Sequence, residues 1–334
     1  MLAGMCLLAC LAGCAFGQSQ DDLQLTAKKR ILPGVGPGLR ALKRGADGNY
    51  YILTAPGSSA AVFDAAGKLV KRIPAFDDGK AATPQPQSPQ LASITYGEDM
   101  DVDALGTIYV ADRGANAIKI WSAKGDARMF GVSGPVSVAS LLDGEIAVAT
   151  MRQPHLVIVY DKNGREVREF GDPETISERP EVNRFLNIGI LLADGPGHLY
   201  YAFPYLPEPT VRQFDRNGYG GQDIQYTGVD AWPAAQATRK EIERQEKRGE
   251  PPVFKRILTG FGVERASGEV WMSLGDKLLH FDKDGNRRAT YLIYTPEGAR
   301  LEANVILIEQ DRLLIGSDPL GIYEFDRPDK KTQQ

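Results

Sequence analysis

The side chains that most often carry catalysis are scarce in this chain. Histidine occurs three times in 334 residues, as His155, His198 and His280. His155 ends a turn, His198 enters a predicted strand and His280 lies within another, so we expect them not to converge on one metal ion. Neither the nucleophile elbow G-x-S-x-G nor the phosphate-binding motif G-x-x-x-x-G-K-[ST] is present. The sequence therefore offers no convincing catalytic base or nucleophile.

Polar residues at the starts of predicted hydrophobic strands are better placed to form a site. They are Arg40, Glu98, Asp99, Arg184, Asn187 and Asn304. Carboxylate and asparagine oxygens are the ligands that Ca²⁺ prefers, so Glu98, Asp99, Asn187 and Asn304 form a candidate metal set. The alternative is that all six residues line a water-filled channel. Because they are far apart in the sequence, only the fold can bring them together.

Two sequence markers recur in a fixed order and indicate that fold. One is an aromatic or apolar residue followed by Asp or Ser and a turn ending in Gly, and the other is a Gly-containing turn followed by a hydrophobic strand. The first occurs at 63–67, 121–125, 160–164, 214–218, 281–285 and, in degraded form, 325–329; the second occurs at 47–53, 105–111, 143–149, 196–202, 267–273 and 310–316. Such alternation of short strands and turns is typical of antiparallel meanders.

Six four-stranded units of this kind predict an all-β fold, a six-bladed β-propeller, because radial repetition protects the strand edges. The unit at 99–131, with D-x-x-G-x-I-Y-V-A-D before I-K-I-W, resembles an NHL repeat. The uninterrupted repeat predicts one ring over 23–329, with 330–334 as a tail. The segment 23–32 resembles the fourth strands of other units, so we expect it to complete the last blade and close the ring.

Three long insertions interrupt the repeat, at 77–90, 172–184 and 230–256. The third contains a predicted helix at 233–248, bounded by a proline in its first turn and by Gly249. All three lie between the last strand of one unit and the first strand of the next. In a propeller these connections share one face, around the mouth of the channel, and a loop-rich face on a rigid scaffold is where binding usually occurs.

The same face is predicted to carry a second set of binding residues. Phe203, Tyr205 and Leu206 stand among three prolines in the turn 203–211, a pattern that suits contact with a peptide, glycan or protein. The alternative is that this turn packs against a neighbouring loop. Polar neighbours on the face would be Arg113, Asn116, Arg152 and His155.

The amino-terminal residues are predicted to be an export signal. Within residues 1–20, a short apolar run is followed by small residues, and this run is too short for a membrane span. Leu11-Ala12-Gly13-Cys14 resembles a bacterial lipobox, which implies a signal peptide at 1–13, a lipid on Cys14 and a tether at 14–22. Ala15 resembles the residue found in proteins sent to the outer membrane. The alternative is an ordinary secretory peptide cut near Ala15–Gly17.

The net charge of the chain bears on the class of ligand that it can bind. The net charge of −4 argues against a nucleic-acid surface, which needs a basic stripe. We therefore predict an exported protein of the bacterial cell envelope, in the outer membrane or periplasm, held by a lipid anchor. It would be a non-catalytic binding or scaffold module without a cofactor, for a protein, peptide or glycan partner. The alternative is a divalent-metal-dependent hydrolase or lyase that resembles lactonase-type propellers and holds Ca²⁺ at the channel mouth.

Overall fold

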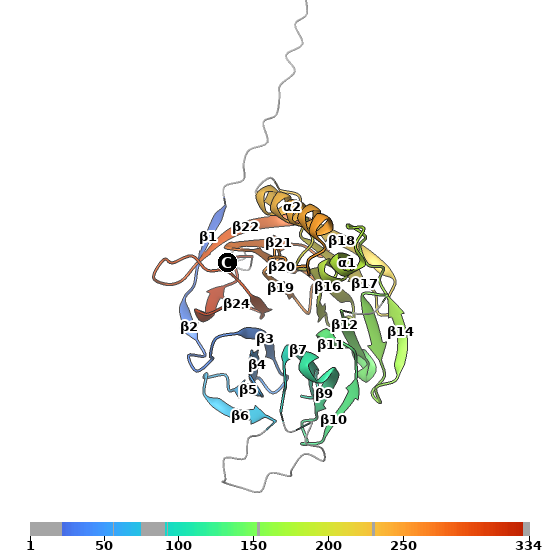
Figure 1. Ribbon diagram of the computed structural model, residues 1–334. Helices are drawn as coiled ribbons and strands as arrows, with labels where there is room; N and C mark the ends of the chain where they lie inside the picture. The colour runs from blue at the N-terminus through green and yellow to red at the C-terminus, as the bar shows by residue number, and fades with distance from the viewer. Residues whose placement is uncertain are drawn as a thin grey trace, which may run out of the picture.

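The computed structural model describes residues 22–55, 57–74, 91, 93–151, 154–228 and 231–329. Its strands form six antiparallel blades around a central axis, as Figure 1 shows, so the predicted six-bladed β-propeller is confirmed. The first three blades are β3–β6 (Leu39–Arg44, Tyr50–Thr54, Ala60–Phe63, Leu69–Ile73), β7–β10 (Gly97–Val102, Ile108–Asp112, Ala117–Trp121, Ala127–Gly131) and β11–β14 (Pro135–Ser140, Ile146–Thr150, Val157–Tyr160, Glu166–Phe170).

The remaining blades follow in chain order around the ring. They are β15–β18 (Ile190–Ala193, Leu199–Phe203, Thr210–Phe214, Gly220–Gln225), β19–β22 (Gly260–Val263, Val270–Leu274, Lys277–Phe281, Arg287–Tyr294) and β23–β25 (Val305–Ile308, Arg312–Ser317, Gly321–Asp326) with an amino-terminal strand. In each blade the first strand lies innermost, next to the first strands of the two neighbouring blades.

The recurring Asp and Gly of the sequence markers close the hairpins. Oδ1 of Asp161 accepts hydrogen bonds from the amides of Asn163 at 2.7 Å and Arg165 at 2.9 Å. Gly164, three residues after Asp161, has a φ of +79°, a conformation that glycine adopts without a steric penalty. The side chain of Asp thus replaces part of the backbone hydrogen bonding of the turn, which is why this residue pair recurs from blade to blade.

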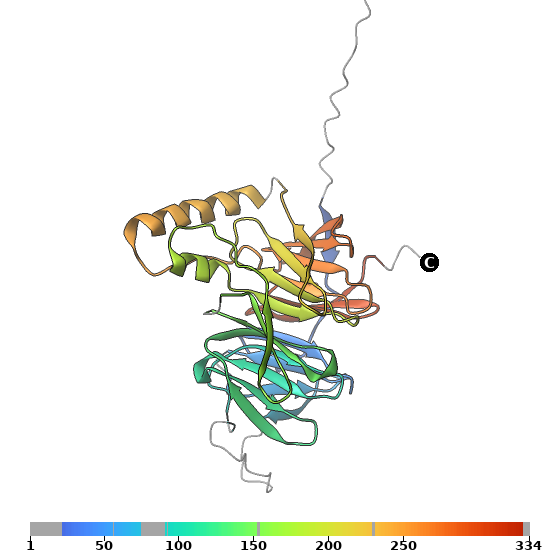
Figure 2. The same cartoon turned by 90° about the vertical axis from the view of Figure 1, so that its right-hand side faces the viewer.

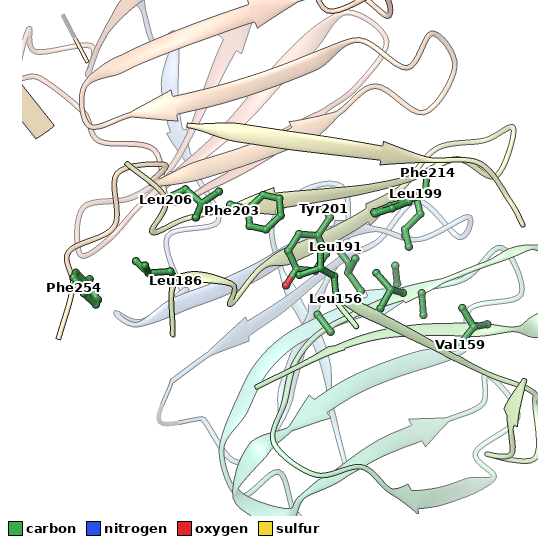
Figure 3. Packing of buried hydrophobic residues seen from close by; sticks show 14 of the residues in the cluster. Leu156, Val159, Leu186, Leu191, Leu199, Tyr201, Phe203, Leu206, Phe214 and Phe254 are labelled. Carbon is green, nitrogen blue, oxygen red and sulfur yellow. The ribbon is translucent and has the colours of Figure 1, made fainter. Parts of the chain in front are cut away.

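The core consists of apolar layers between neighbouring blades. In β8 the alternate side chains Ile108 and Val110 pack with blade 1, whereas Tyr109 and Ala111 pack with blade 3. This is the two-residue period of a strand that is buried on both faces. Figure 3 shows the layer between blades 3 and 4, where Tyr201 and its neighbours are buried.

Two amino-terminal strands close the ring. Strand β2 (Lys29–Ile31) pairs antiparallel with β25 and completes blade 6, as predicted. Strand β1 (Leu23–Thr26) instead pairs parallel with β22 and adds a fifth strand to blade 5, so the prediction that all of 23–32 joins the last blade is wrong for β1. The chain crosses between the two blades where the amide of Ala27 bonds to Tyr294 and the amide of Lys28 bonds to Glu324.

Two helices lie on one face of the disc, as Figure 2 shows. Helix α2 (Trp232–Arg248) confirms the predicted helix, and Ile242 is buried in its inner face. Helix α1 (Pro180–Leu186) was not predicted; Val182 and Leu186 bury it in the same apolar cluster as Ile242. The insertion predicted at 77–90 lies outside the described residues. Within the described part of the chain, no helix has the length and apolar character that crossing a membrane requires.

Candidate functional site

A cavity of about 620 Å³ lies at the centre of the ring and is lined by residues of all six inner strands. Its size falls in the range of roughly 300–1,000 Å³ that is usual for small-molecule sites. We call the end at which the inner strands begin the channel mouth. It is formed by Arg40, Tyr96, Glu98, Arg113, Met151, Phe185, Ile188, Pro204, Tyr205, Arg256 and Asn304.

Two arginines approach one carboxylate at the channel mouth. Nε of Arg113 lies 2.7 Å from Oε1 of Glu98, and Nη1 of Arg40 lies 3.6 Å from Oε2. Both guanidinium groups also lie over the ring of Tyr96, with Cζ 4.9 Å from the ring centroid for Arg113 and 5.8 Å for Arg40. Nη2 of Arg40 donates to the Tyr96 hydroxyl at 3.0 Å. Glu98 therefore neutralises one of two clustered cations.

Arg113 is held in this place by the turn between β8 and β9. A short 3₁₀ helix (Arg113–Ala115) begins there, and Asp112 caps it by accepting the amide of Ala115. Asn116 ends the helix with a φ of +49°, a left-handed conformation that asparagine tolerates better than most residues. Oδ1 of Asn116 accepts from the amide of Gly134 at 3.0 Å, so Asn116 ties the turn to blade 3.

The blade 4 side of the mouth is aromatic. Phe185 of α1 packs against Tyr205, with ring centroids 4.8 Å apart in an edge-to-face arrangement, and against Phe254 at 5.5 Å. Nε of Arg256, from the segment after α2, donates to the hydroxyl of Tyr205 at 3.4 Å. The two helical insertions therefore build this wall of the mouth.

Asp99 and Asp101 of β7 line the interior of the cavity, but their carboxylates serve the scaffold. Asp99 accepts hydrogen bonds from Ser137 Oγ and from the amides of Met100 and Val138, and burial raises the pKa of Asp99 despite these bonds and the charge of Lys43. Oδ1 of Asp101 lies 3.3 Å from Nζ of Lys43. Both residues thereby join inner strands of neighbouring blades.

Four of the six residues predicted at strand starts line the cavity, and two do not. Arg40, Glu98, Asp99 and Asn304 line the cavity, as expected of a channel position. Asn187 instead ends α1 and is buried, with its side chain bonded to the backbone of Glu174 and Asn183. Arg184 belongs to the last turn of α1 and is not among the cavity-lining residues. The inserted helix α1 takes both residues away from the mouth.

The residues predicted on the loop-rich face also take different positions, some buried and some at the channel mouth. Phe203 ends β16 and is fully buried, and Leu206 is 5 % exposed, so the packed alternative describes both. Tyr205 reaches the channel mouth. His155 lies half-buried, with Nε2 3.5 Å from Glu169. Arg152 and Cys14 lie outside the described residues.

A separate cluster surrounds the buried side chain of Arg327. Among the described residues, Glu269, His280 and Asp329 present ligand atoms within 4.8 Å of one another. Arg327 is paired with Glu269, Asp329 and Glu264, at 2.6 Å from the last. Burial lowers the pKa of His280 to about 4, so it is neutral near pH 7. Because a guanidinium already neutralises these carboxylates, a second cation would be repelled, and the cluster clamps the end of blade 6 to blade 5.

Several mouth residues were missed by the sequence analysis. Tyr96 precedes β7, Phe185 lies in the unpredicted α1, and Arg256 follows the prolines after α2. The proline at the start of α1 and the apolar Val182 and Leu186, four residues apart, were a helix signal that would have placed Phe185 on a structured element.

Solved structures with the same fold include several enzymes. The gluconolactonase of Xanthomonas campestris superposes with a TM-score of 0.57 over 93% of this chain and 96% of that chain, at 17% identity. A streptogramin B lyase gives a TM-score of 0.52 at 15% identity, over 87% of this chain and 84% of that one. The virginiamycin B lyase of Staphylococcus aureus gives 0.50 at 12% identity, over 90% and 87%.

At these identities the likeness concerns the fold alone. No protein-family model matches the chain, and no curated protein matches it by sequence. The resemblance of the 99–131 unit to an NHL repeat therefore stays a prediction.

Proposed function

We propose that this protein is a non-catalytic binding module that takes its ligand at the channel mouth, on the loop-rich face. One observation carries the proposal: the mouth opens into a cavity of about 620 Å³, while its carboxylate, Glu98, is paired with two arginines. Both oxygens of this carboxylate already face guanidinium groups, so Glu98 is poorly placed to accept a proton from a ligand. The pattern suits recognition better than proton transfer.

The way in which the mouth is built supports binding. Its side chains come from inner strands, from α1, from a capped turn and from short connecting segments beside the strands. Helix α1 and the segment after α2 are packed in the apolar cluster of blades 3 and 4. A site on rigid elements loses little conformational entropy when a ligand binds. The cavity volume suits a small molecule, or the end of a peptide or glycan, rather than a whole folded partner.

A pair of cavity variants tests this proposal. Val136→Trp would fill the cavity from β11, and Ala104→Trp would add the same side chain at the opposite end, beyond β7. A library of small molecules, short peptides and oligosaccharides is screened by thermal shift against the full chain. Ligands of the mouth should be lost with Val136→Trp and kept with Ala104→Trp. A screen without a stabilising compound, or ligands that survive Val136→Trp, would contradict the proposal.

A metal-dependent hydrolase or lyase is the second candidate. It is favoured by the shared fold with a gluconolactonase and two lyases, and by Glu98, Asp99 and Asn304 lining one cavity. The donors fit a metal ion poorly. The oxygens of Glu98 face two arginines, and those of Asp99 accept hydrogen bonds from blade 3 and from its own strand. Oδ1 of Asn304 accepts from the amide of Asp318 at 2.6 Å. We derive no catalytic step from this set.

The proposed location is the bacterial cell envelope, with a lipid on Cys14, on the strength of the lipobox-like sequence alone. Cell fractionation of the full chain and of Cys14→Ser tests it. The full chain should sediment with membranes and Cys14→Ser should not, with Cys6→Ser as the matched control. Equal sedimentation of both cysteine variants would speak against the anchor.

A further inference from the structure

The charge of the channel mouth is opposite in sign to that of the whole chain. The chain has a net charge of −4, whereas the mouth combines Arg40, Arg113 and Arg256 with one carboxylate, Glu98. The rest of the cavity is lined by three basic and four acidic side chains, namely Lys43, Arg44, Arg265, Asp99, Asp101, Asp103 and Glu309. The cavity is thus polarised along its axis, and low-dielectric walls strengthen the field at the positive end. An anion is attracted to the mouth specifically.

Arg40 and Arg113 are positioned to receive that anion. Arg113 is 41% exposed and Arg40 is 27% exposed, so both are reachable although each is fixed by contacts with Glu98 and Tyr96. Nη1 of Arg113 lies 3.9 Å from the sulfur of Met151, which is a weak hydrogen-bond acceptor. A carboxylate oxygen in its place would form a stronger, charge-assisted hydrogen bond with Arg113. Since Glu98 offsets one of the two charges, this pair retains one net positive charge and suits a monoanion.

The opposite side of the mouth is aromatic and apolar, apart from Arg256, which donates to the hydroxyl of Tyr205. Phe185, Ile188 and Tyr205 belong to the blade 4 side, which faces blade 1 and Arg40 across a ring of six blades. Phe185 is held by Tyr205 and Phe254, so its ring is a fixed surface and not a mobile one. A ligand that satisfies both sides must carry an anionic group at one end and an apolar body at the other.

We propose that the ligand is a small organic monocarboxylate with an aromatic or aliphatic body. Its carboxylate would lie between Arg40 and Arg113, and its body against Phe185, Ile188 and Tyr205. Arginine forms paired hydrogen bonds to carboxylates with defined geometry, and the aromatic wall provides area without ordering flexible side chains. This inference deepens the proposed binding function and rests on it.

Isothermal titration of the full chain at low salt tests the inference with three probes. They are 4-phenylbutyrate, 4-phenylbutanol, which lacks the charge, and butyrate, which lacks the ring. We expect 4-phenylbutyrate to bind at least tenfold more tightly than either of the others, and its affinity to fall as salt is added. Arg113→Gln should weaken it at least tenfold, whereas Arg265→Gln, at the other end of the cavity, should leave it unchanged.

Three results would overturn the inference: no binding of 4-phenylbutyrate, equal binding of 4-phenylbutanol, or full affinity in Arg113→Gln. The tryptophan variants distinguish a failure of the monocarboxylate inference from a failure of the proposed binding function. If neutral compounds stabilise the wild type and Ala104→Trp but not Val136→Trp, the mouth is a binding site for another ligand class and only the inference falls. If neither neutral nor anionic compounds bind there, both proposals fall.

Discussion

Nζ of Lys119 lies 2.8 Å from Oδ2 of Asp112, and the two side chains are 1% and 0% exposed. Asp112 also accepts hydrogen bonds from the amides of Thr95 and Tyr96, each at 2.8 Å, and Lys119 donates to the carbonyl of Ser93 at 2.7 Å. Asp112 immediately precedes Arg113. One buried ion pair thus fixes the backbone of both Tyr96 and Arg113, the residues that shape the cationic side of the channel mouth.

Asp112→Asn should destabilise the fold by about 3–5 kcal/mol, because it leaves the charge of Lys119 buried without a counter-ion. Urea unfolding followed by fluorescence measures the loss. The double variant Asp112→Asn/Lys119→Met, which removes both charges, should recover part of it. A loss below about 1 kcal/mol in Asp112→Asn would mean that water or another group solvates Lys119, contrary to its burial.

The same carboxylate predicts a pH dependence. Burial alone would raise the pKa of Asp112, but the hydrogen bonds from Lys119, Thr95 and Tyr96 outweigh it and hold the pKa below its ordinary value. The stability that this shift contributes is complete above the unfolded-state pKa of about 3.9 and is lost as pH falls through the folded-state pKa.

Unfolding free energies measured from pH 7 to pH 3 therefore should fall more steeply for the wild type than for Asp112→Asn. Asp99→Asn provides the control of opposite sign, since burial raises the pKa of Asp99 and its contribution is lost as pH rises. Removing Asp99 should make the acid loss steeper. Parallel curves for the wild type and both variants would show that neither carboxylate is coupled to folding.

The fold and part of the site were predictable because position within a blade determines where a side chain points. Arg40, Glu98 and Asn304 stand near the starts of their inner strands, and the repeat markers located those strands from their turns. Each inner strand runs along the cavity, so a residue near the start of an inner strand lies at the same end of the cavity in every blade. No knowledge of the neighbouring blades is needed for that step.

The rest of the mouth depends on packing between segments that are distant in the sequence. Phe185 reaches the mouth only because α1 docks on α2 and blade 4, and Arg256 only because the chain returns from α2. Similarly, Asn187 was predicted at the channel but ends α1, where its side chain donates hydrogen bonds to the carbonyls of Glu174 and Asn183. Insertions lie outside the repeat. The directions of their side chains therefore depend on contacts with distant segments, which the local sequence pattern does not specify.

Metal removal should leave the fold unchanged if the mouth binds organic ligands without a metal. Thermal unfolding of the full chain is compared in EDTA and after addition of Ca²⁺, Mn²⁺ or Zn²⁺. A metal bound at a hundred times its dissociation constant would add about 2.7 kcal/mol to the unfolding free energy, a shift that is easily seen. A rise that Asp99→Ala and Asn304→Ala abolish would favour the hydrolase or lyase over the binding module.

Closure of the ring should depend on β2 far more than on β1. Both strands are mostly exposed, but β1 adds a fifth strand to a blade that is already complete, whereas β2 supplies the missing strand of blade 6. Chains that begin at residues 22, 27 and 32 isolate the two contributions. The chain from 27 should lose the hydrogen bonds of β1 but keep a closed ring. The chain from 32 should lose about 3 kcal/mol more, since each strand hydrogen bond contributes roughly 1 kcal/mol and β2 pairs with β25 through three residues. Its exposed β25 edge should also promote association, seen as larger species on size-exclusion chromatography. Equal losses for both truncations would mean that the ring is held by inter-blade packing and not by its amino-terminal strand.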